Sequence, residues 1–231
     1  MKLSEKILRA FFPERCPLCG KIIDLREADC LDCRSDVIKL GKDCCKGCGC
    51  EKDRCLCAED RIVLSDFASV YIYTGLIRAQ IHNFKFRGNK ALGKSLGDEM
   101  AYRLSECFLD SDFDLVTYVP ISKSGLKERG YNQSEILAKR VAKRFFLPCK
   151  GVLCKVSETS KQHKLSAEER KNNIKGAFAL CPNADVKGKT ILLCDDVKTT
   201  GATLKECEKV LYECGALKVC SFTLALTDYV L

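Results

Sequence analysis

Two neighbouring acids and the hydroxyl-rich turn after them are the residues whose types and spacing best suit chemistry. Asp195 and Asp196 follow an apolar run at 190–194, and the sequence Thr-Thr-Gly-Ala-Thr occupies 199–203. Such a turn at the start of a helix presents free backbone N–H groups, which together with the helix dipole favour a phosphate. Carboxylates beside it suit a ligand with both a phosphate and vicinal hydroxyls, such as a ribose 5-phosphate moiety. An acidic cap on an ordinary strand-to-helix turn is the structural alternative.

Cysteine is the second chemical feature, because ten of the 18 cysteines lie between Cys16 and Cys57. They form an internal repeat in which a C-x-x-C-G knuckle is followed by a second close pair. Two intervening residues let a tight turn aim both sulfurs at one tetrahedral ion at about 2.3 Å, and the glycine tolerates a positive φ. Two pairs complete a closed set of four ligands, which is typical of structural zinc. The predicted ligands are Cys16, Cys19, Cys30, Cys33, Cys45, Cys48, Cys55 and Cys57.

The second half of this repeat leaves its ligand set open. Its last pair has only one intervening residue, so Cys50 is an alternative to Cys55, and Cys44 is a spare. Redox-active cysteines and iron–sulfur ligation are rival interpretations, but paired C-x-x-C spacing ending in glycine favours zinc. The eight cysteines scattered from Cys107 to Cys220 are predicted to be small buried hydrophobic residues.

Charge divides the chain near residue 60. Residues 1–60 hold twelve basic and twelve acidic residues, whereas residues 61–231 hold 27 and 19 and so carry the whole net charge of +8. We therefore predict an N-terminal helix and double zinc-ribbon domain at 1–60, and a larger basic domain at 61–231. The first segment lacks a hydrophobic core, so metal would supply most of its folding free energy. The basic domain suits partners that carry phosphates.

Strands and helices alternate from residue 66 onward. Apolar runs predict strands over 67–73, 115–119, 190–194 and 219–226. Helical periodicity predicts helices over 74–84, 91–104, 132–146 and 202–214. This alternation predicts an α/β fold with a parallel sheet. Ligands of such sheets bind at the carboxyl ends of the strands, which is where the acid pair lies.

The acid pair and the turn after it resemble the phosphoribosyl pyrophosphate signature of type I phosphoribosyltransferases. Three further features resemble the ComF family of competence proteins: the sequence E-R-G-Y-N-Q at 128–133, a block between Gln162 and Phe178, and the paired cysteines. The likeness covers nearly the whole chain. It implies a parallel-sheet phosphoribosyltransferase-like domain with an N-terminal Cys-rich double zinc ribbon.

The resemblance also implies roles for the matching residues. Asp195 and Asp196 would contact the ribose 2′- and 3′-hydroxyls, directly or through Mg²⁺, and would be the catalytic acids if there is turnover. The 5-phosphate would be held by Thr199, Thr200, Gly201, Ala202 and Thr203, and the pyrophosphate by Ile121, Ser122 and Lys123. Segment 157–175 would match a mobile loop that closes over the ligand. Lys198 departs from the signature, where an uncharged residue is usual, and would pair with an acid or touch the ligand.

Three functions are compatible with these features. The family resemblance implies binding of phosphoribosyl pyrophosphate with Mg²⁺ in a role in competence, the uptake of transforming single-stranded DNA, with that DNA and other DNA-uptake proteins as partners. An active phosphoribosyltransferase on an unknown acceptor, with no role in DNA uptake, is the second function. A non-catalytic zinc-ribbon adaptor is the third, and the intact signature argues against it.

The helix predicted over 132–146 carries the strongest nucleic-acid pattern. Its basic residues share one face next to two aromatic residues, a pattern that suits a phosphate backbone and stacked bases; these are Lys139, Arg140, Lys143, Arg144, Phe145 and Phe146. An ordinary solvated face is the alternative. No apolar run reaches the roughly 20 residues that span a bilayer, and residues 1–13 lack a secretory-signal pattern. We therefore expect a cytoplasmic protein without membrane insertion.

Purified protein should contain about two zinc ions per chain, because eight cysteine ligands fill two four-cysteine sites. Sequential pairing is expected, since short loops close at a lower entropic cost than interleaved ones. Elemental analysis measures the ratio, and one zinc ion per chain would mean that only one half of the repeat binds metal.

Overall fold

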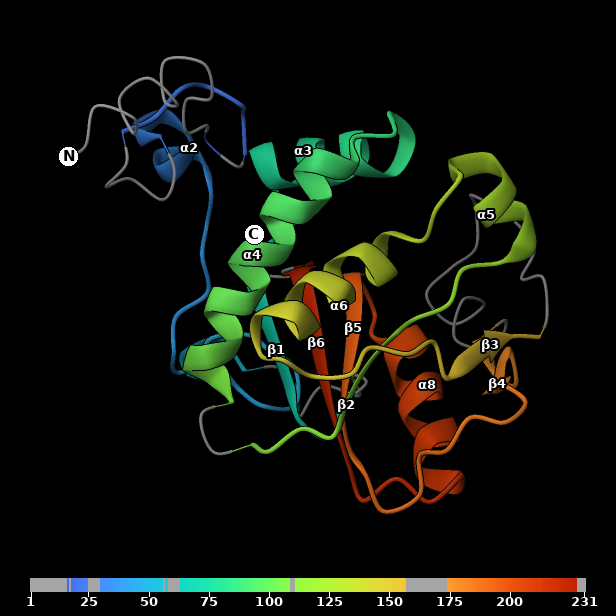
Figure 1. Ribbon diagram of the computed structural model, residues 1–231. Helices are drawn as coiled ribbons and strands as arrows, with labels where there is room; N and C mark the ends of the chain where they lie inside the picture. Colours follow the sequence, from blue (N-terminus) through green and yellow to red (C-terminus); the bar gives the residue numbers. More distant parts are fainter. Residues whose placement is uncertain are drawn as a thin grey trace.

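Four parallel strands form the central sheet of the computed structural model, which describes residues 16, 18–24, 30–55, 57, 63–108, 111–156 and 174–227. The strands lie in the order β1-β6-β5-β2 (Figure 1). Their bounds are β1 Phe67–Ile72, β2 Leu115–Tyr118, β5 Thr190–Lys198 and β6 Lys218–Leu226. The predicted parallel α/β sheet is therefore confirmed.

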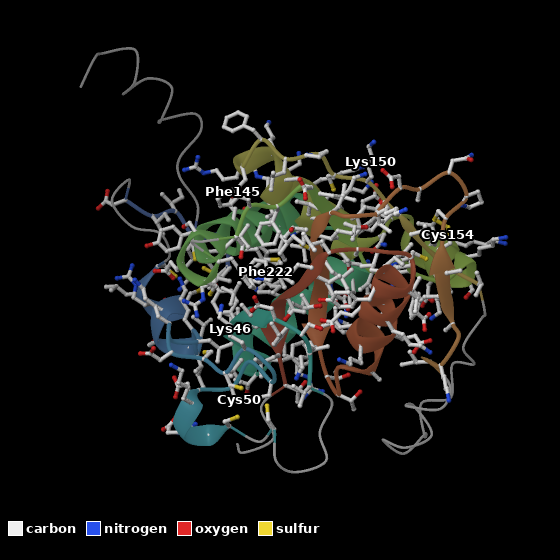
Figure 2. The ribbon with its side chains drawn as sticks, turned by 90° about the horizontal axis from the view of Figure 1, so that it is seen from below. Lys46, Cys50, Phe145, Lys150, Cys154 and Phe222 are labelled. Atoms are coloured by element: carbon white, nitrogen blue, oxygen red, sulfur yellow. A yellow bond between two sulfur atoms is a disulfide. The ribbon has the colours of Figure 1, made fainter. Side chains whose placement is uncertain are left out.

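Helices cover both faces of this sheet. On one face lie α3 (Gly75–Phe86), α4 (Lys90–Cys107) and α6 (Gln133–Arg144), and on the other lies α8 (Ala202–Glu213). Side chains alternate between faces along a strand, so Leu192 and Cys194 pack with α4 and α6 whereas Leu193 packs with α8. Phe222 of β6 lies in the middle of the packed side chains (Figure 2). Covering on both faces explains why the strands are continuous apolar runs.

The observed elements differ from the predicted ones mainly at their ends. β5 continues through Lys198, so the two acids lie inside the strand rather than after it, and Asp195 pairs in register with Thr223 of β6. Some short elements were not predicted, because they are too short to show a period. They are α2 (Leu31–Asp36), η1 (Lys52–Arg54), α5 (Lys123–Arg129), and the antiparallel pair β3 (Leu153–Lys155) and β4 (Phe178–Leu180).

The second half of the cysteine-rich segment packs against the sheet. Lys39 pairs with Tyr71 of β1 in an antiparallel bridge. Next to it, the amide of Leu40 donates to the carbonyl of Val70 at 3.0 Å. Cys48 and Cys50 are buried in the same hydrophobic cluster as residues of α8. Contacts thus cross the boundary predicted at residue 60, and the division into two domains stays a prediction.

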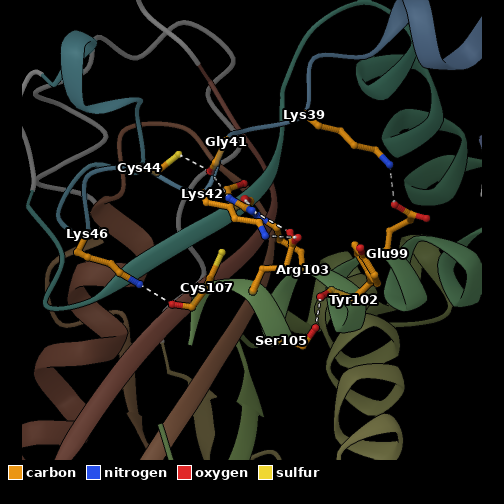
Figure 3. Close-up of polar contacts among 12 residues, drawn as sticks. Lys39, Gly41, Lys42, Cys44, Lys46, Glu99, Tyr102, Arg103, Ser105 and Cys107 are labelled. Carbon is orange, nitrogen blue, oxygen red and sulfur yellow. Dashed lines mark hydrogen bonds and ion pairs between the residues drawn. The ribbon is translucent and has the colours of Figure 1, made fainter. Parts of the chain in front are cut away.

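Helix α4 holds the segment that leads into this second half (Figure 3). The guanidinium of Arg103, which is buried, donates to the carbonyl of Gly41. The ammonium of Lys46 donates to the carbonyl of Cys107 at the end of α4, at 2.7 Å. The carbonyls of Gly41 and Cys107 and the amide of Leu40 therefore all have hydrogen-bond partners. These hydrogen bonds keep the segment in one position.

The scattered cysteines do not behave as one class. Cys154 of β3 and Cys181, the residue after β4, form a disulfide (Figure 2), and Cys214 is exposed. The prediction that all eight are small buried hydrophobic residues is wrong for these three. It is confirmed for the three that pack between the sheet and its helices, Cys194, Cys207 and Cys220.

Two predicted segments lie outside the described residues. They are the N-terminal helix within 1–13 and all but the last two residues of the loop predicted at 157–175. In the part of the chain that the structure describes, no helix is both long enough and apolar enough to cross a bilayer.

Replacing Gly49 by Ala should destabilise the protein more than replacing Gly20, its counterpart in the first knuckle. Both glycines have a positive φ, +84° and +78°, as the knuckles predict. A Cβ on Gly49 would lie 2.3 Å from Cε1 of Phe67, whereas a Cβ on Gly20 would meet nothing within 4 Å. The left-handed backbone costs about 1–2 kcal/mol in both variants, and overpacking adds about 1–3 kcal/mol at Gly49 only.

Urea unfolding of the zinc-loaded variants measures this difference. Equal losses of unfolding free energy in Gly49→Ala and Gly20→Ala would show that the second knuckle does not depend on its contact with β1.

Candidate functional site

The site lies where β5 ends and α8 begins, at the carboxyl edge of the sheet. Gly201 has a φ of +87° and occupies the cap position before α8. Glycine has no side chain that could accept a hydrogen bond from the first helical turn, so amides of that turn are available to a ligand. Among the described groups, the hydroxyl of Thr200 accepts from the amide of Ala202 at 3.4 Å. The predicted phosphate residues 199–203 therefore form one turn at a helix N-terminus, which is a favourable place for an anion.

The two acids at the end of β5 take partners from different helices. Oδ1 of Asp195 accepts hydrogen bonds from the hydroxyl of Ser134 at 2.6 Å and from the amide of Asp196 at 2.8 Å. Burial and the neighbouring carboxylate of Asp196 raise the pKa of Asp195 to about 7, although both hydrogen bonds oppose this rise. Ser134 lies in the first turn of α6, so this helix holds Asp195 in place.

Asp196 forms an ion pair with Lys85 of α3, with Nζ 2.9 Å from Oδ1. The side chains are 11% and 21% exposed, respectively, so water screens this pair less than it screens a surface pair. Burial works against the charge of Lys85, but the carboxylates of Asp196 and Asp195 outweigh it and raise the pKa of Lys85 above its ordinary value. Lys85 is therefore positively charged in the site at neutral pH.

The sequence R-G-Y-N-Q at 129–133 joins the elements that surround the acids. The side-chain amide of Asn132 donates to the carbonyl of Val119 at 2.9 Å, and its oxygen accepts from the amide of Ser134 at 3.0 Å. The hydroxyl of Tyr131 donates to the carbonyl of Phe84 in α3. One short block thus connects the ends of β2, α3 and α6.

The residues predicted to hold pyrophosphate lie in the turn after β2. The amide of Val119 donates to the carbonyl of Cys194 at 3.0 Å, so this turn starts beside the strand that carries the acids. Ser122 caps α5 by accepting from the amide of Gly125 at 3.1 Å, and Lys123 is the first residue of α5 and exposed. Ile121 precedes the cap and is half-buried. Their roles toward a ligand stay predictions.

Lys198 contacts the second cysteine knuckle. Its ammonium donates to the carbonyl of Cys48 at 3.1 Å and lies over the ring of Phe67, 5.2 Å from the centroid. The side chain is buried. The residue that departs from the signature thus connects the strand of the acids to a metal knuckle.

Eight cysteines form two clusters in the order of the sequence. The members are Cys16, Cys19, Cys30 and Cys33 in the first cluster, and Cys45, Cys48, Cys55 and Cys57 in the second. The sulfurs within each cluster lie within 4.8 Å of one another. Four sulfurs at about 2.3 Å from a tetrahedral zinc ion are about 3.8 Å apart, and the pairs Cys19–Cys30 and Cys48–Cys55 measure 3.5 and 3.9 Å. The clusters fit zinc.

The structure also separates the spare cysteines from the ligands. Cys50 is buried and lies outside the second cluster, and the thiol of Cys44 donates to the carbonyl of Gly41 at 3.2 Å. Burial disfavours the thiolate of Cys45, but amide donors, including that of Cys48, outweigh it and lower the pKa to about 6. A thiolate is the form that binds metal, and Cys45 is the cysteine of this cluster in which that form is favoured, because the pKa values of Cys55 and Cys57 are raised.

The two carboxylates offer only part of the oxygen ligands that a Mg²⁺ ion needs. Oδ1 of Asp195 accepts two hydrogen bonds and Oδ1 of Asp196 pairs with Lys85. Mg²⁺ needs six oxygens at about 2.0–2.1 Å and often takes one or two carboxylates together with substrate phosphates. The residues therefore fit a Mg²⁺ ion held mainly by the oxygens of a bound ligand.

Two residues of this site were missed by the sequence analysis. Lys85 lies 111 residues before its partner Asp196, so no local spacing connects them. Ser134 is the second residue of α6, and nothing in the local sequence connects it with Asp195, 61 residues later. The sequence shows only that Lys85 lies at the end of a helix predicted from its apolar residues, and a lysine is ordinary on the exposed face of such a helix.

Known proteins are similar to this chain in sequence. A family model described as phosphoribosyl transferase domain matches residues 131–228. Competence protein ComFC of Bacillus subtilis is 31% identical over 122 residues, which are 48% of this chain and 50% of that protein. DNA utilization protein YhgH of Salmonella typhimurium is 29% identical over 174 residues, which are 71% of this chain and 70% of that protein.

A solved structure of a purine phosphoribosyltransferase from Pyrococcus horikoshii is also similar. It is 20% identical with a TM-score of 0.37, and the match covers 57% of this chain and 73% of that one. The domain match and the order of the strands define the chain as a phosphoribosyltransferase-fold protein with N-terminal cysteine clusters. In sequence the chain is similar to proteins named for competence and for DNA utilization. The match to the Bacillus protein spans half the length of that relative.

Proposed function

We propose that this protein binds phosphoribosyl pyrophosphate together with Mg²⁺ at the carboxyl edge of its sheet. The observation that carries the proposal is the junction of β5 and α8. Two carboxylates held near the end of the strand are followed, after the turn 199–201, by a helix N-terminus without a side-chain cap. Vicinal hydroxyls can donate to the carboxylates while a phosphate accepts from the amides. A single ribose 5-phosphate moiety meets both demands.

The pyrophosphate of this ligand would lie toward the turn after β2. That turn starts at Val119, which is bonded to the carbonyl of Cys194 next to the acids. Lys123 is exposed there and adds a positive charge. The oxygens of pyrophosphate would supply the ligands that the carboxylates alone do not offer to Mg²⁺. With a suitable acceptor, displacement of pyrophosphate from the anomeric carbon would be the reaction, and the carboxylates would stabilise positive charge on the ribose.

The names of the similar proteins support a proposal for the role in the cell. The similar proteins are named for competence and for DNA utilization, and we propose that this chain also acts in the uptake of transforming single-stranded DNA, in the cytoplasm. An active phosphoribosyltransferase on an unknown acceptor, without a role in DNA uptake, is the alternative. Release of pyrophosphate in the presence of candidate acceptors distinguishes the two.

Replacing both acids by their amides should abolish binding of phosphoribosyl pyrophosphate. Asp195→Asn with Asp196→Asn removes the acceptors for the ribose hydroxyls and the negative charges near Mg²⁺. Isothermal titration calorimetry with phosphoribosyl pyrophosphate and Mg²⁺ should show binding by the wild type and a loss of at least about a hundredfold in affinity in the double variant, since two hydrogen bonds to charged groups contribute about 1.5–3 kcal/mol each.

A matched control is the amide variant of an acid away from the site. Asp185→Asn changes an exposed carboxylate that pairs with Lys189, and it should bind the ligand like the wild type. If the double variant bound phosphoribosyl pyrophosphate as tightly as the wild type, the ribose would lie elsewhere.

A groove between α4 and α6 favours single-stranded DNA as a second ligand. Its volume is about 660 Å³, and its lining includes Tyr102, Arg144 and Phe146. Phe146 is 94% exposed and Tyr102 is 70% exposed. Exposed aromatic rings beside basic side chains are typical platforms for unpaired bases. Phe145 also lines the groove, but it is partly buried and packs against the hydrophobic core.

Two of the four basic residues predicted to contact DNA are paired with acids. Arg140 forms two hydrogen bonds with Asp98, and Lys139 pairs with Glu135 at 2.6 Å. Lys143 and Arg144, at the end of α6, are exposed and lie close in sequence to Phe146. We therefore place the DNA contact on the groove rather than along the whole helix.

Tyr102→Ala with Phe146→Ala should weaken binding of a single-stranded oligonucleotide about tenfold or more, since stacking on an aromatic ring contributes about 1–3 kcal/mol per base. Lys139→Ala serves as the control and should change the affinity little. Fluorescence anisotropy over a range of salt concentrations measures both effects. Absence of binding by the wild type at low salt contradicts a DNA function for this groove.

A further inference from the structure

Lys85 is the cation in direct contact with the acid pair among the described residues. It lies in the last turn of α3, and its Nζ is 2.9 Å from Oδ1 of Asp196. The carboxylate of Asp195 is close enough to help raise the pKa of Lys85. Neither the family signature nor the comparisons assign this lysine a role.

The residues on either side hold Lys85 in place. Phe84 is fully buried, and its carbonyl accepts from the hydroxyl of Tyr131. Its ring lies where Gly93 has no side chain, since a Cβ there would be 2.3 Å from the ring. The guanidinium of Arg129 lies 5.2 Å from the centroid of the Phe86 ring. The end of α3 is therefore anchored from two sides, and the backbone of Lys85 cannot leave the acids without disturbing the core.

This arrangement changes what the acids offer to another cation. An isolated pair of carboxylates attracts a divalent ion strongly, whereas a fixed ammonium at one of them repels it. The same ammonium neutralises part of the negative charge that would otherwise oppose an incoming phosphate. Metal binding and ligand binding at this edge are thus both controlled by one side chain.

We propose that Lys85 is the resident cation of the site and occupies, at Asp196, the place that a divalent metal ion would otherwise take. This inference deepens the proposed function, because it concerns the residues to which the ribose is assigned. Ribose 5-phosphate then binds without a divalent ion, and Mg²⁺ enters with the pyrophosphate. Lys85 is a positioning residue, since it acts through the carboxylate of Asp196.

The first test measures the affinity of the zinc-loaded full-length protein for Mn²⁺ alone, by electron paramagnetic resonance of the free ion. Lys85→Gln keeps a hydrogen-bond donor near Asp196 but removes the charge. It should bind Mn²⁺ at least about tenfold more tightly than the wild type, since removal of one charge within about 4 Å of the ion is a large effect in a partly buried site. Lys85→Arg should bind Mn²⁺ as weakly as the wild type.

Two controls show where the ion binds. Lys90→Gln removes a nearby lysine that lies over the Tyr131 ring, and it should bind Mn²⁺ like the wild type. Adding Asp196→Asn to Lys85→Gln should remove the gain in affinity. Circular dichroism checks the fold of each variant, and Lys85→Met replaces Lys85→Gln if the latter does not fold.

The second test measures ribose 5-phosphate by calorimetry in buffer freed of divalent ions, and again with Mg²⁺. The wild type should bind equally under both conditions. Lys85→Gln should bind about tenfold more weakly without Mg²⁺ and should recover when Mg²⁺ is added. A lysine that only supports the structure would weaken binding whether or not Mg²⁺ is present.

The outcomes separate this inference from the proposed function. Equal Mn²⁺ affinity of Lys85→Gln and the wild type overturns the role of Lys85, and so does a requirement of the wild type for Mg²⁺ in binding ribose 5-phosphate. Tighter Mn²⁺ binding by Lys85→Gln in a protein that binds neither ribose 5-phosphate nor phosphoribosyl pyrophosphate supports Lys85 as the resident cation. That same result contradicts the proposed ligand.

Discussion

The arrangement of this protein depends on two adjacent carboxylates at the end of a buried parallel strand. A charged group in such a place is costly unless it is paired or hydrogen-bonded. Two helices on one face of the sheet, α3 and α6, have their ends near the acids, and each acid takes its partner from a different helix. Asp195 takes Ser134 from α6, and Asp196 takes Lys85 from α3. The ends of two helices are therefore fixed by the need to stabilise one dipeptide.

The block at 129–133 holds the two helices and the strand end in fixed positions. Through Asn132 and Tyr131 it connects the end of β2 and the end of α3 to the start of α6. The acids, the turn after β2 and the N-terminus of α8 thus meet at one edge, which is where open parallel sheets bind their ligands. A ribose phosphate would find its acceptors and its donors already in place, and little free energy would be lost in ordering them.

The second cysteine cluster packs directly against the central sheet. Gly49 allows the second knuckle to lie directly on Phe67, and Lys198 connects its backbone to the strand that carries the acids. Bound metal would therefore stabilise β1 and β5 as well as the knuckle itself. A change in the second cluster has a physical route to the ligand site that a flexibly attached domain would lack.

The amino-acid sequence by itself determined the class of fold, the strands and helices of the sheet, the eight cysteines of the two clusters, and the acid-and-turn segment. These are local properties: apolar runs, helical periods, close cysteine pairs and a turn sequence each lie within a short window. Only the tertiary structure decided that Lys85 neutralises Asp196, that Cys154 and Cys181 are joined, and that Lys198 contacts Cys48. Each of these contacts joins residues far apart in the chain, and burial, which no short window reveals, is what makes a partner necessary.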